Sequence, residues 1–163
     1  MVDIFDKDLD EIVKDYEVMA KEYSLPNWEK LDENFDTSKA FTGEGGIVLR
    51  DIRRKINEKI ASYLHLFESF MNPHSTPLFL MNTLKNLEEQ DWEKIRKVYK
   101  ELAKIQFQQI MADTVYSEEK EAKLIREMFD IWEKQKQTIQ SIIESLEKKY
   151  GENFNPKKSN YFG

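Results

Sequence analysis

The chain has 163 residues, 40% hydrophobic and 34% charged, and this length is enough to build one hydrophobic core. It contains no cysteine, which excludes a disulfide framework, a thiolate metal site and a cysteine nucleophile. The net charge of −6 disfavours general nucleic-acid binding, because a polyanion would be repelled at long range. The first ten residues are acidic and no apolar run reaches 18 residues, so we expect a cytoplasmic protein with no membrane partner.

Apolar residues recur every three to four positions along nearly the whole chain, which is the period of amphipathic α-helices. We therefore expect an all-α fold, with a single-domain helical bundle over residues 1–151 and a C-terminal tail over residues 152–163. The bundle is predicted to have four long helices and one short helix in a mainly up-down order. The predicted helices cover residues 6–23, 47–71, 77–87, 89–112 and 118–150.

The first predicted helix ends before Pro26, because proline disfavours a helical conformation in the residue that precedes it. Residues 24–46 then form the longest connection, in which one helical turn within residues 27–35 places Trp28, Leu31 and Phe35 on one face. Three large apolar groups indicate that this connection packs across the bundle. Residues 43–46, Gly-Glu-Gly-Gly, are expected to close it as a flexible joint.

The later helices show different apolar patterns. The helix at 77–87 is apolar on more than one side, so it must be buried or meet a partner. In the helix at 89–112, the inward stripe is expected to end at Gln109 or Ile110. In the last helix, a polar interruption between Trp132 and Ile139 indicates either a solvent-facing overhang or a polar contact, and Gly151 is expected to end the helix as a left-handed C-cap.

Three of the five arginines, Arg50, Arg53 and Arg54, lie within five residues near the start of the helix at 47–71. Arginine suits bidentate contacts with carboxylates or phosphates, so one hypothesis is an anion or nucleic-acid site. The favoured alternative is an internal partner. Residues 1–46 hold 13 acidic and 5 basic side chains, a net of −8, and join this helix directly.

His65 and Glu68 lie one helical turn apart and are candidates for two metal ligands. Di-metal bundles need a Glu-x-x-His pair on each of two helices, and here the order is reversed and no second pair exists. A flanking histidine is therefore the favoured interpretation, and no cofactor is expected. Gln106, Gln108 and Gln109 either line a polar cavity or lie on a solvated helix face. No arrangement of a nucleophile and a base can be argued, so no catalytic residue is predicted.

Three segments carry a resemblance: Ser24–Phe35 (SLPNWEKLDENF), Leu49–Ile60 (LRDIRRKINEKI) and Val98–Leu102 (VYKEL). In outline they resemble a family of small, uncharacterised archaeal all-helical proteins. The resemblance implies an archaeal source and an all-helical fold, and it adds no activity and no site residues.

The leading functional hypothesis is a non-enzymatic interaction or scaffold protein that self-associates or holds a protein partner through a helical face. Large apolar groups exceed what four helices require, and the interface candidates are Leu78 and Phe79 in the short helix and Trp28 and Phe41 in the long connection. The alternative is a regulator that binds nucleic acid or a phosphate ligand through the three arginines.

Overall fold

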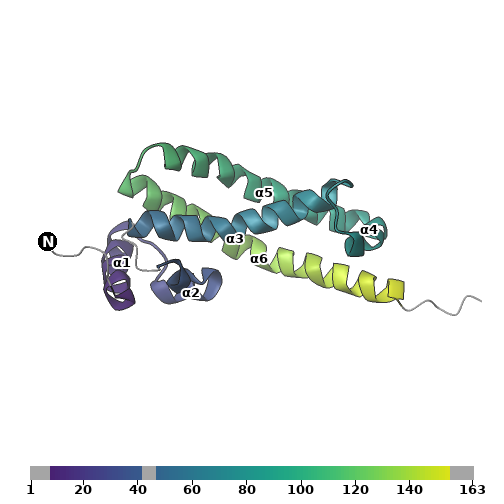
Figure 1. Cartoon of the computed structure of the whole chain (residues 1–163), viewed down its shortest axis with the longest axis horizontal. Helices are drawn as coiled ribbons and strands as arrows, with labels where there is room; N and C mark the ends of the chain where they lie inside the picture. The colour runs from purple at the N-terminus through teal and green to yellow at the C-terminus, as the bar shows by residue number, and fades with distance from the viewer. Residues whose placement is uncertain (1–7, 42–46, 155–163) are drawn as a thin grey trace, which may run out of the picture.

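The computed structural model describes residues 8–41 and 47–154, and these residues form six α-helices and one short 3-10 helix, with no strand among them (Figure 1). The helices pack as a single helical body, which confirms the all-α prediction. Their bounds are α1 Leu9–Tyr23, α2 Trp28–Phe35, η1 Thr37–Ala40, α3 Val48–Met71, α4 Leu78–Lys85, α5 Glu89–Thr114 and α6 Glu118–Phe154. The expected glycine joint at 43–46 and all but the first three residues of the expected tail lie outside the described residues.

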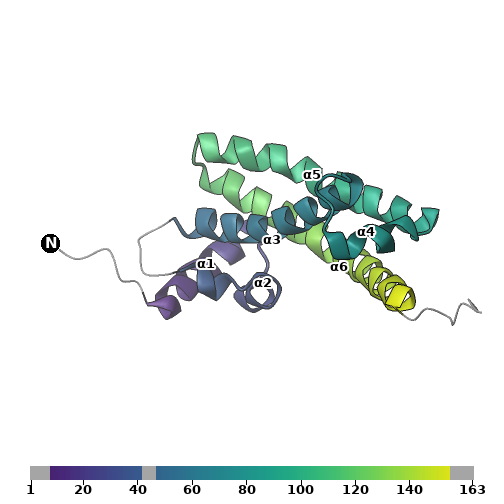
Figure 2. The ribbon, with the colours of Figure 1, turned by 45° about the vertical axis from the view of Figure 1, so that its right-hand side comes forward.

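Three long helices, α3, α5 and α6, form the body of the molecule and run side by side in alternating directions (Figures 1 and 2). Their buried faces repeat every three to four residues, as the sequence pattern predicted. Residues that are fully or almost fully buried include Ile52, Ile56 and Ile60 of α3, Ile95, Val98, Leu102 and Ile105 of α5, and Ile125, Met128 and Ile142 of α6. The predicted fourth long helix is α1, which has only 15 residues and runs across one end of these three.

A folded corner between α1 and α2 explains why α1 does not extend the bundle. Ser24 ends α1 in the left-handed conformation, with φ 53°, and residues 24–27 connect α1 to α2. The Tyr16 hydroxyl donates a hydrogen bond to the Pro26 carbonyl at 2.5 Å, and the Tyr16 and Trp28 rings lie 5.6 Å apart. Asn27 accepts a hydrogen bond from the Lys30 amide at 3.0 Å, which caps the N-terminus of α2.

The predicted single helical turn within residues 27–35 is a helix of eight residues, α2, which buries Leu31 and Phe35 against the bundle. The next turn is also locally stabilised, because Asp32 accepts hydrogen bonds from the Ser38 amide at 2.7 Å and from the Thr37 hydroxyl at 3.2 Å. The predicted packing of this connection across the bundle is therefore observed for its described part.

The predicted C-cap at Gly151 is wrong, because α6 continues through Gly151 to Phe154. No residue packs within 4 Å of the position that a Cβ atom would occupy at Gly151, and its backbone is not left-handed.

At the same end of the molecule, α4 packs against α6. Among the described helices, none is both long enough and apolar enough to span a lipid bilayer.

Candidate functional site

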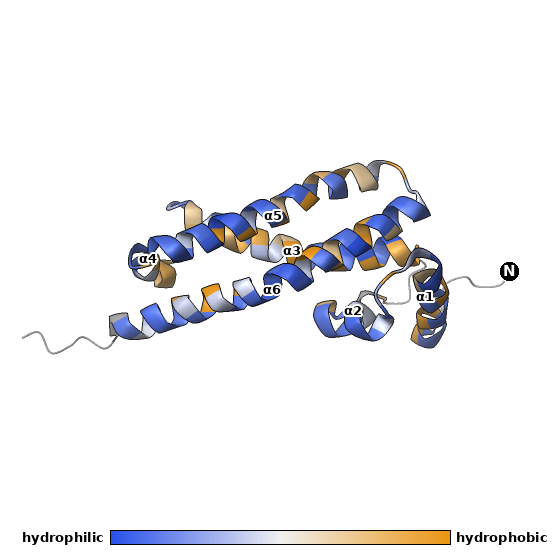
Figure 3. Cartoon of the chain, turned by 180° about the vertical axis from the view of Figure 1, so that it is seen from behind, coloured by the Kyte–Doolittle hydropathy of each residue, from blue (hydrophilic) through white to orange (hydrophobic). Residues whose placement is uncertain are grey.

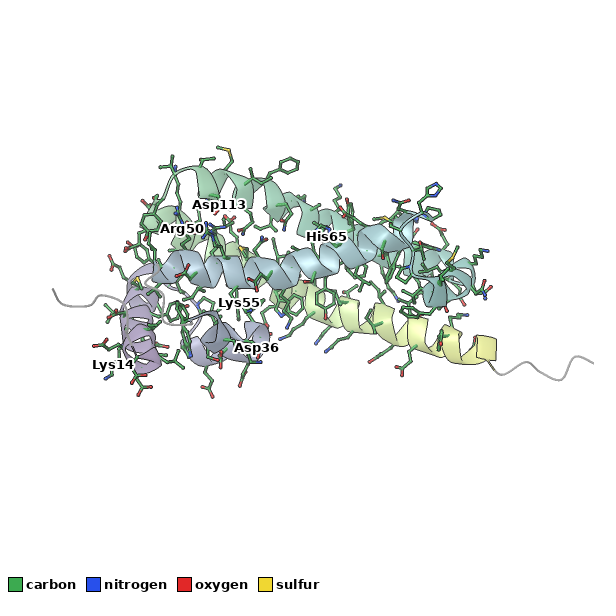
Figure 4. All side chains as sticks on the ribbon, viewed as in Figure 1. Lys14, Asp36, Arg50, Lys55, His65 and Asp113 are labelled. Carbon is green, nitrogen blue, oxygen red and sulfur yellow. The ribbon has the colours of Figure 1, made fainter. Side chains whose placement is uncertain are left out.

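The three arginines lie at the end of the bundle where α5 turns into α6, and Figure 4 labels Arg50 and Asp113 there. Arg53 is only 1% exposed, which is rare for an arginine. The helical period explains its position, because Arg53 lies on the same face of α3 as Leu49, Ile52 and Ile56. A buried guanidinium requires charged or polar partners, since an unpaired ion would cost several kcal/mol.

Side chains from α5 and α6 supply these partners and form a network around Arg53, which we call the Arg53 network. The Arg53 Nε atom donates to Glu121, which is also 1% exposed, Nη1 donates to Gln109 Oε1, and Nη2 donates to Asp113 Oδ1 at 2.6 Å. One arginine of α3 therefore forms hydrogen bonds with side chains of both α5 and α6.

Two further arginines extend the network towards solvent. The Arg50 Nε atom lies 3.3 Å from the second carboxylate oxygen of Glu121, and the Arg50 guanidinium stacks over the Tyr116 ring at 5.0 Å from the ring centroid. The Arg54 Nη2 atom lies 3.4 Å from Asp113 Oδ1. The hydrogen bond from Arg53 holds the pKa of the Asp113 carboxyl below its usual value. Burial raises the pKa of the neighbouring Asp51 carboxyl.

The sequence predicted that the arginines pair with acidic residues of the same chain, but the acceptors observed lie in a different segment from the one predicted. The expected acidic partners lay within residues 1–46, whereas the described acceptors are Gln109, Asp113 and Glu121. Enclosure in the bundle leaves Arg53 inaccessible to an external anion in this conformation. Anion binding through Arg50 and Arg54, both accessible to solvent, stays a prediction.

The last turns of α5 carry exposed apolar side chains, and two of them, Phe107 and Met111, lie on the opposite side of the helix from Gln109. The members of this group, which we call the α5 stripe, are Phe107, Ile110 and Met111 of the helix and Val115 directly after it, with exposed fractions of 76%, 65%, 68% and 68%. Positions i, i+3 and i+4, here Phe107, Ile110 and Met111, share one face of an α-helix, whereas Val115 follows the helix with an extended backbone. In the ribbon of Figure 3, which is coloured by hydropathy, the last turns of α5 include tan and orange segments beside blue ones.

The α5 stripe was not predicted from the sequence, which left either Gln109 or Ile110 as the last inward residue of this helix. The structure turns Gln109 inward, with 3% exposure, and leaves Ile110 exposed, because the Gln109 amide oxygen accepts from Arg53 and its amide nitrogen donates to the Met128 sulfur. The sequence contains a pattern that could have revealed these exposed residues, because α5 carries two separate apolar series. One series runs through Ile95, Val98, Leu102 and Ile105, and the second begins at Phe107 on a different face.

The predicted interface residues divide into two groups. Leu78 and Phe79 of α4 are exposed, and the Phe79 ring lies 6.3 Å from the Tyr150 ring. Trp28 and Phe41 are half-buried and pack against each other, with ring centroids 5.9 Å apart. Only the α4 pair is therefore available on the surface as an apolar contact site.

The metal candidates lie on the exposed side of α3, away from the Arg53 network, and Figure 4 labels His65 there. His65 Nδ1 and Glu68 Oε2 are 3.1 Å apart, and the Tyr99 hydroxyl donates to Glu68 at 3.2 Å. These three residues help to line a groove of about 510 Å³. Across residues 8–41 and 47–154, no three His, Cys, Asp or Glu side chains are grouped so that they could hold a metal ion.

Comparison of the chain with protein-family models, with curated proteins and with solved structures finds no match. The resemblance to archaeal helical proteins stays a prediction.

Proposed function

We propose that this protein is a non-enzymatic interaction module that binds a helical segment of a protein through the α5 stripe. The observation that carries the proposal is the placement of three large exposed apolar side chains, Phe107, Ile110 and Met111, on the last turns of α5, with the exposed Val115 directly after the helix. Contiguous apolar surface of this kind marks contact sites, because burying each such side chain contributes about 1.5–3 kcal/mol. A partner helix can pack against a row with this spacing by the ridges-into-grooves geometry of helix pairs.

The Arg53 network supports the proposal from the opposite side of the same helix. It joins the last turns of α5 to α3 and α6 through Gln109, Asp113 and Glu121. A contact surface on a helix that is held in one orientation loses less conformational entropy on binding than a mobile one. The network therefore has a role as a rigid support, which needs no external anion.

Photo-crosslinking tests the proposal, because it captures whichever protein contacts the α5 stripe. Benzoylphenylalanine replaces Phe107 in the full-length chain, expressed in its source cells, and the matched control places it at Val18. Val18 is also an exposed apolar residue, at 67%, but lies on α1. We expect light-dependent protein adducts from position 107 and few or none from position 18.

The identity of the adducts does not affect this test, because a second copy and a different protein both count as partners. Loss of the adducts when Met111→Glu is added would strengthen the result, since this exposed position can carry a charge without disturbing the core. Equal labelling from positions 107 and 18, or no labelling from position 107, contradicts the proposed function.

A further inference from the structure

A groove of about 390 Å³ lies between α5 and α6, and its charged lining is basic. Lys94 and Lys97 of α5 and Lys134 of α6 line it, and none of the described residues that line it is acidic. The register of the two antiparallel helices brings these cations together. The Ser145 hydroxyl of α6 donates a hydrogen bond to Asp91 of α5 at 2.9 Å, so later residues of α5 face earlier residues of α6.

The buried member of this lining is Gln135, which is only 4% exposed. Across residues 8–41 and 47–154, its side-chain amide forms no hydrogen bond. The amide is nevertheless not sealed inside the protein, because Thr83 Oγ1 is the only fully enclosed polar side-chain atom without a partner in that part of the chain. Buried amides normally have hydrogen-bond partners. The Gln135 amide therefore opens into the groove, where a ligand can supply its partner.

The other polar side chains of the groove indicate the chemistry of that ligand. They are Gln137, Thr138 and Ser141 of α6. Lys97 and Lys134 form no ion pair with a described residue, whereas Lys94 lies 3.4 Å from Asp91. Ammonium groups bind phosphoryl oxygens as point charges, and amide and hydroxyl groups can donate to the remaining oxygens. Cations on two facing helices suit a ligand that carries more than one phosphoryl group.

We propose that this groove binds a small anion with two or three linked phosphoryl groups, held by Lys94, Lys97 and Lys134, with Gln135 as a hydrogen-bond donor. The net charge of −6 opposes a small anion less than a long nucleic acid, because charges more than about 8 Å away are screened at physiological ionic strength. The groove does not include the α5 stripe, so this proposal and the proposed function stand or fall separately.

Isothermal titration calorimetry of the full-length chain with inorganic triphosphate tests the site. We expect saturable binding of one anion per chain that weakens as salt is added. Replacing Lys97 and Lys134 together by glutamine should lower the affinity at least about 10-fold. The matched control, Lys120→Gln with Lys148→Gln, removes the same charge from exposed positions of α6 outside the groove. It should bind within about two-fold of the wild type, because distant exposed charges are screened.

Two further variants separate a ligand role from a structural role. Gln135→Leu removes no hydrogen bond within the described residues, so the urea midpoint should stay the same or rise, while the affinity should fall about 5-fold. Glu101→Gln should raise the affinity. The hydrogen bond from Lys104, followed by nearby charges that include Lys134, lowers the pKa of the Glu101 carboxyl, so this acidic group lies close to the proposed site.

Four results would overturn the proposal. They are no saturable binding of triphosphate at millimolar concentration, equal losses of affinity in the two double-lysine variants, unchanged affinity in Gln135→Leu, and inorganic phosphate binding as tightly as triphosphate. The last would mean that the lysines do not act together on linked phosphoryl groups. Adenosine triphosphate distinguishes two sources of the same chemistry. Tighter binding than triphosphate supports a nucleotide ligand, and equal or weaker binding supports a free oligophosphate.

Discussion

The Arg53 side chain of α3 donates a hydrogen bond to the Glu121 carboxylate of α6, and both side chains are 1% exposed although 68 residues separate them in the sequence. Two buried ions of opposite charge depend on each other, because each compensates the desolvation of the other. This pair connects the first turns of α3 with the first turns of α6. It thereby fixes the end of the molecule that displays the α5 stripe.

Replacing Glu121 tests the energetic weight of this pair. Glu121→Gln keeps the shape but leaves the Arg53 charge without its fully buried counter-ion, so we expect a loss of about 3 kcal/mol in the free energy of unfolding. Urea titration followed by circular dichroism measures this loss. The control Glu119→Gln changes an exposed residue of the same helix and should stay within about 0.5 kcal/mol of the wild type. Equal unfolding midpoints for the two variants would contradict a structural role of the pair.

The Asp113 carboxyl predicts a pH dependence of stability. Its pKa is lowered in the folded protein by the hydrogen bond from Arg53, so its contribution is complete above the ordinary value of 3.8 and is lost as the pH falls through the lower folded value. The wild type should therefore be more stable than Asp113→Asn at pH 7 and pH 5, and this difference should shrink below pH 4. Urea unfolding at these pH values measures it. A difference that is the same at pH 7 and pH 3 would show that Asp113 is not stabilised in the folded state.

The hydrogen bond from Trp132 Nε1 to Asn34 Oδ1, at 3.0 Å, joins α6 to α2. Trp132→Phe keeps an aromatic ring against Phe35 but removes the donor, and Asn34→Ala removes the acceptor. In a double-mutant cycle we expect a coupling energy of about 1 kcal/mol between the two substitutions. Thermal or urea unfolding of the four proteins provides the measurement. Strictly additive losses would mean that this hydrogen bond does not contribute to holding α2 against α6.

Gly151 gives a test of how α6 ends. Because its backbone is helical and its surroundings are open, Gly151→Ala should raise helix content and stabilise the protein by up to about 1 kcal/mol. Circular dichroism at 222 nm and urea unfolding check this expectation. A left-handed C-cap, as the sequence alone indicated, would give the opposite sign, since alanine is strained in that conformation.

Local patterns predicted most of the secondary structure. The apolar spacing in residues 47–71 and 118–150 predicted α3 to within one residue and most of α6, and the proline at 26 placed the end of α1. The extent of α2 was underestimated, because its eight residues gain their stability from burying Leu31 and Phe35 against other helices. Short helices of this kind depend on tertiary contacts more than on their own propensity.

The sequence by itself determined that this chain is helical and which residues share a helical face, because hydrogen bonding four residues apart and the 3.6-residue period are local properties. Only the tertiary structure decided which faces meet. It paired Arg53 with Gln109, Asp113 and Glu121 rather than with the acidic first 46 residues, and it turned Phe107, Ile110, Met111 and Val115 outward. The physical reason is that contacts between distant segments depend on the packing of all the helices together, and the periodicity within one helix carries no record of its neighbours.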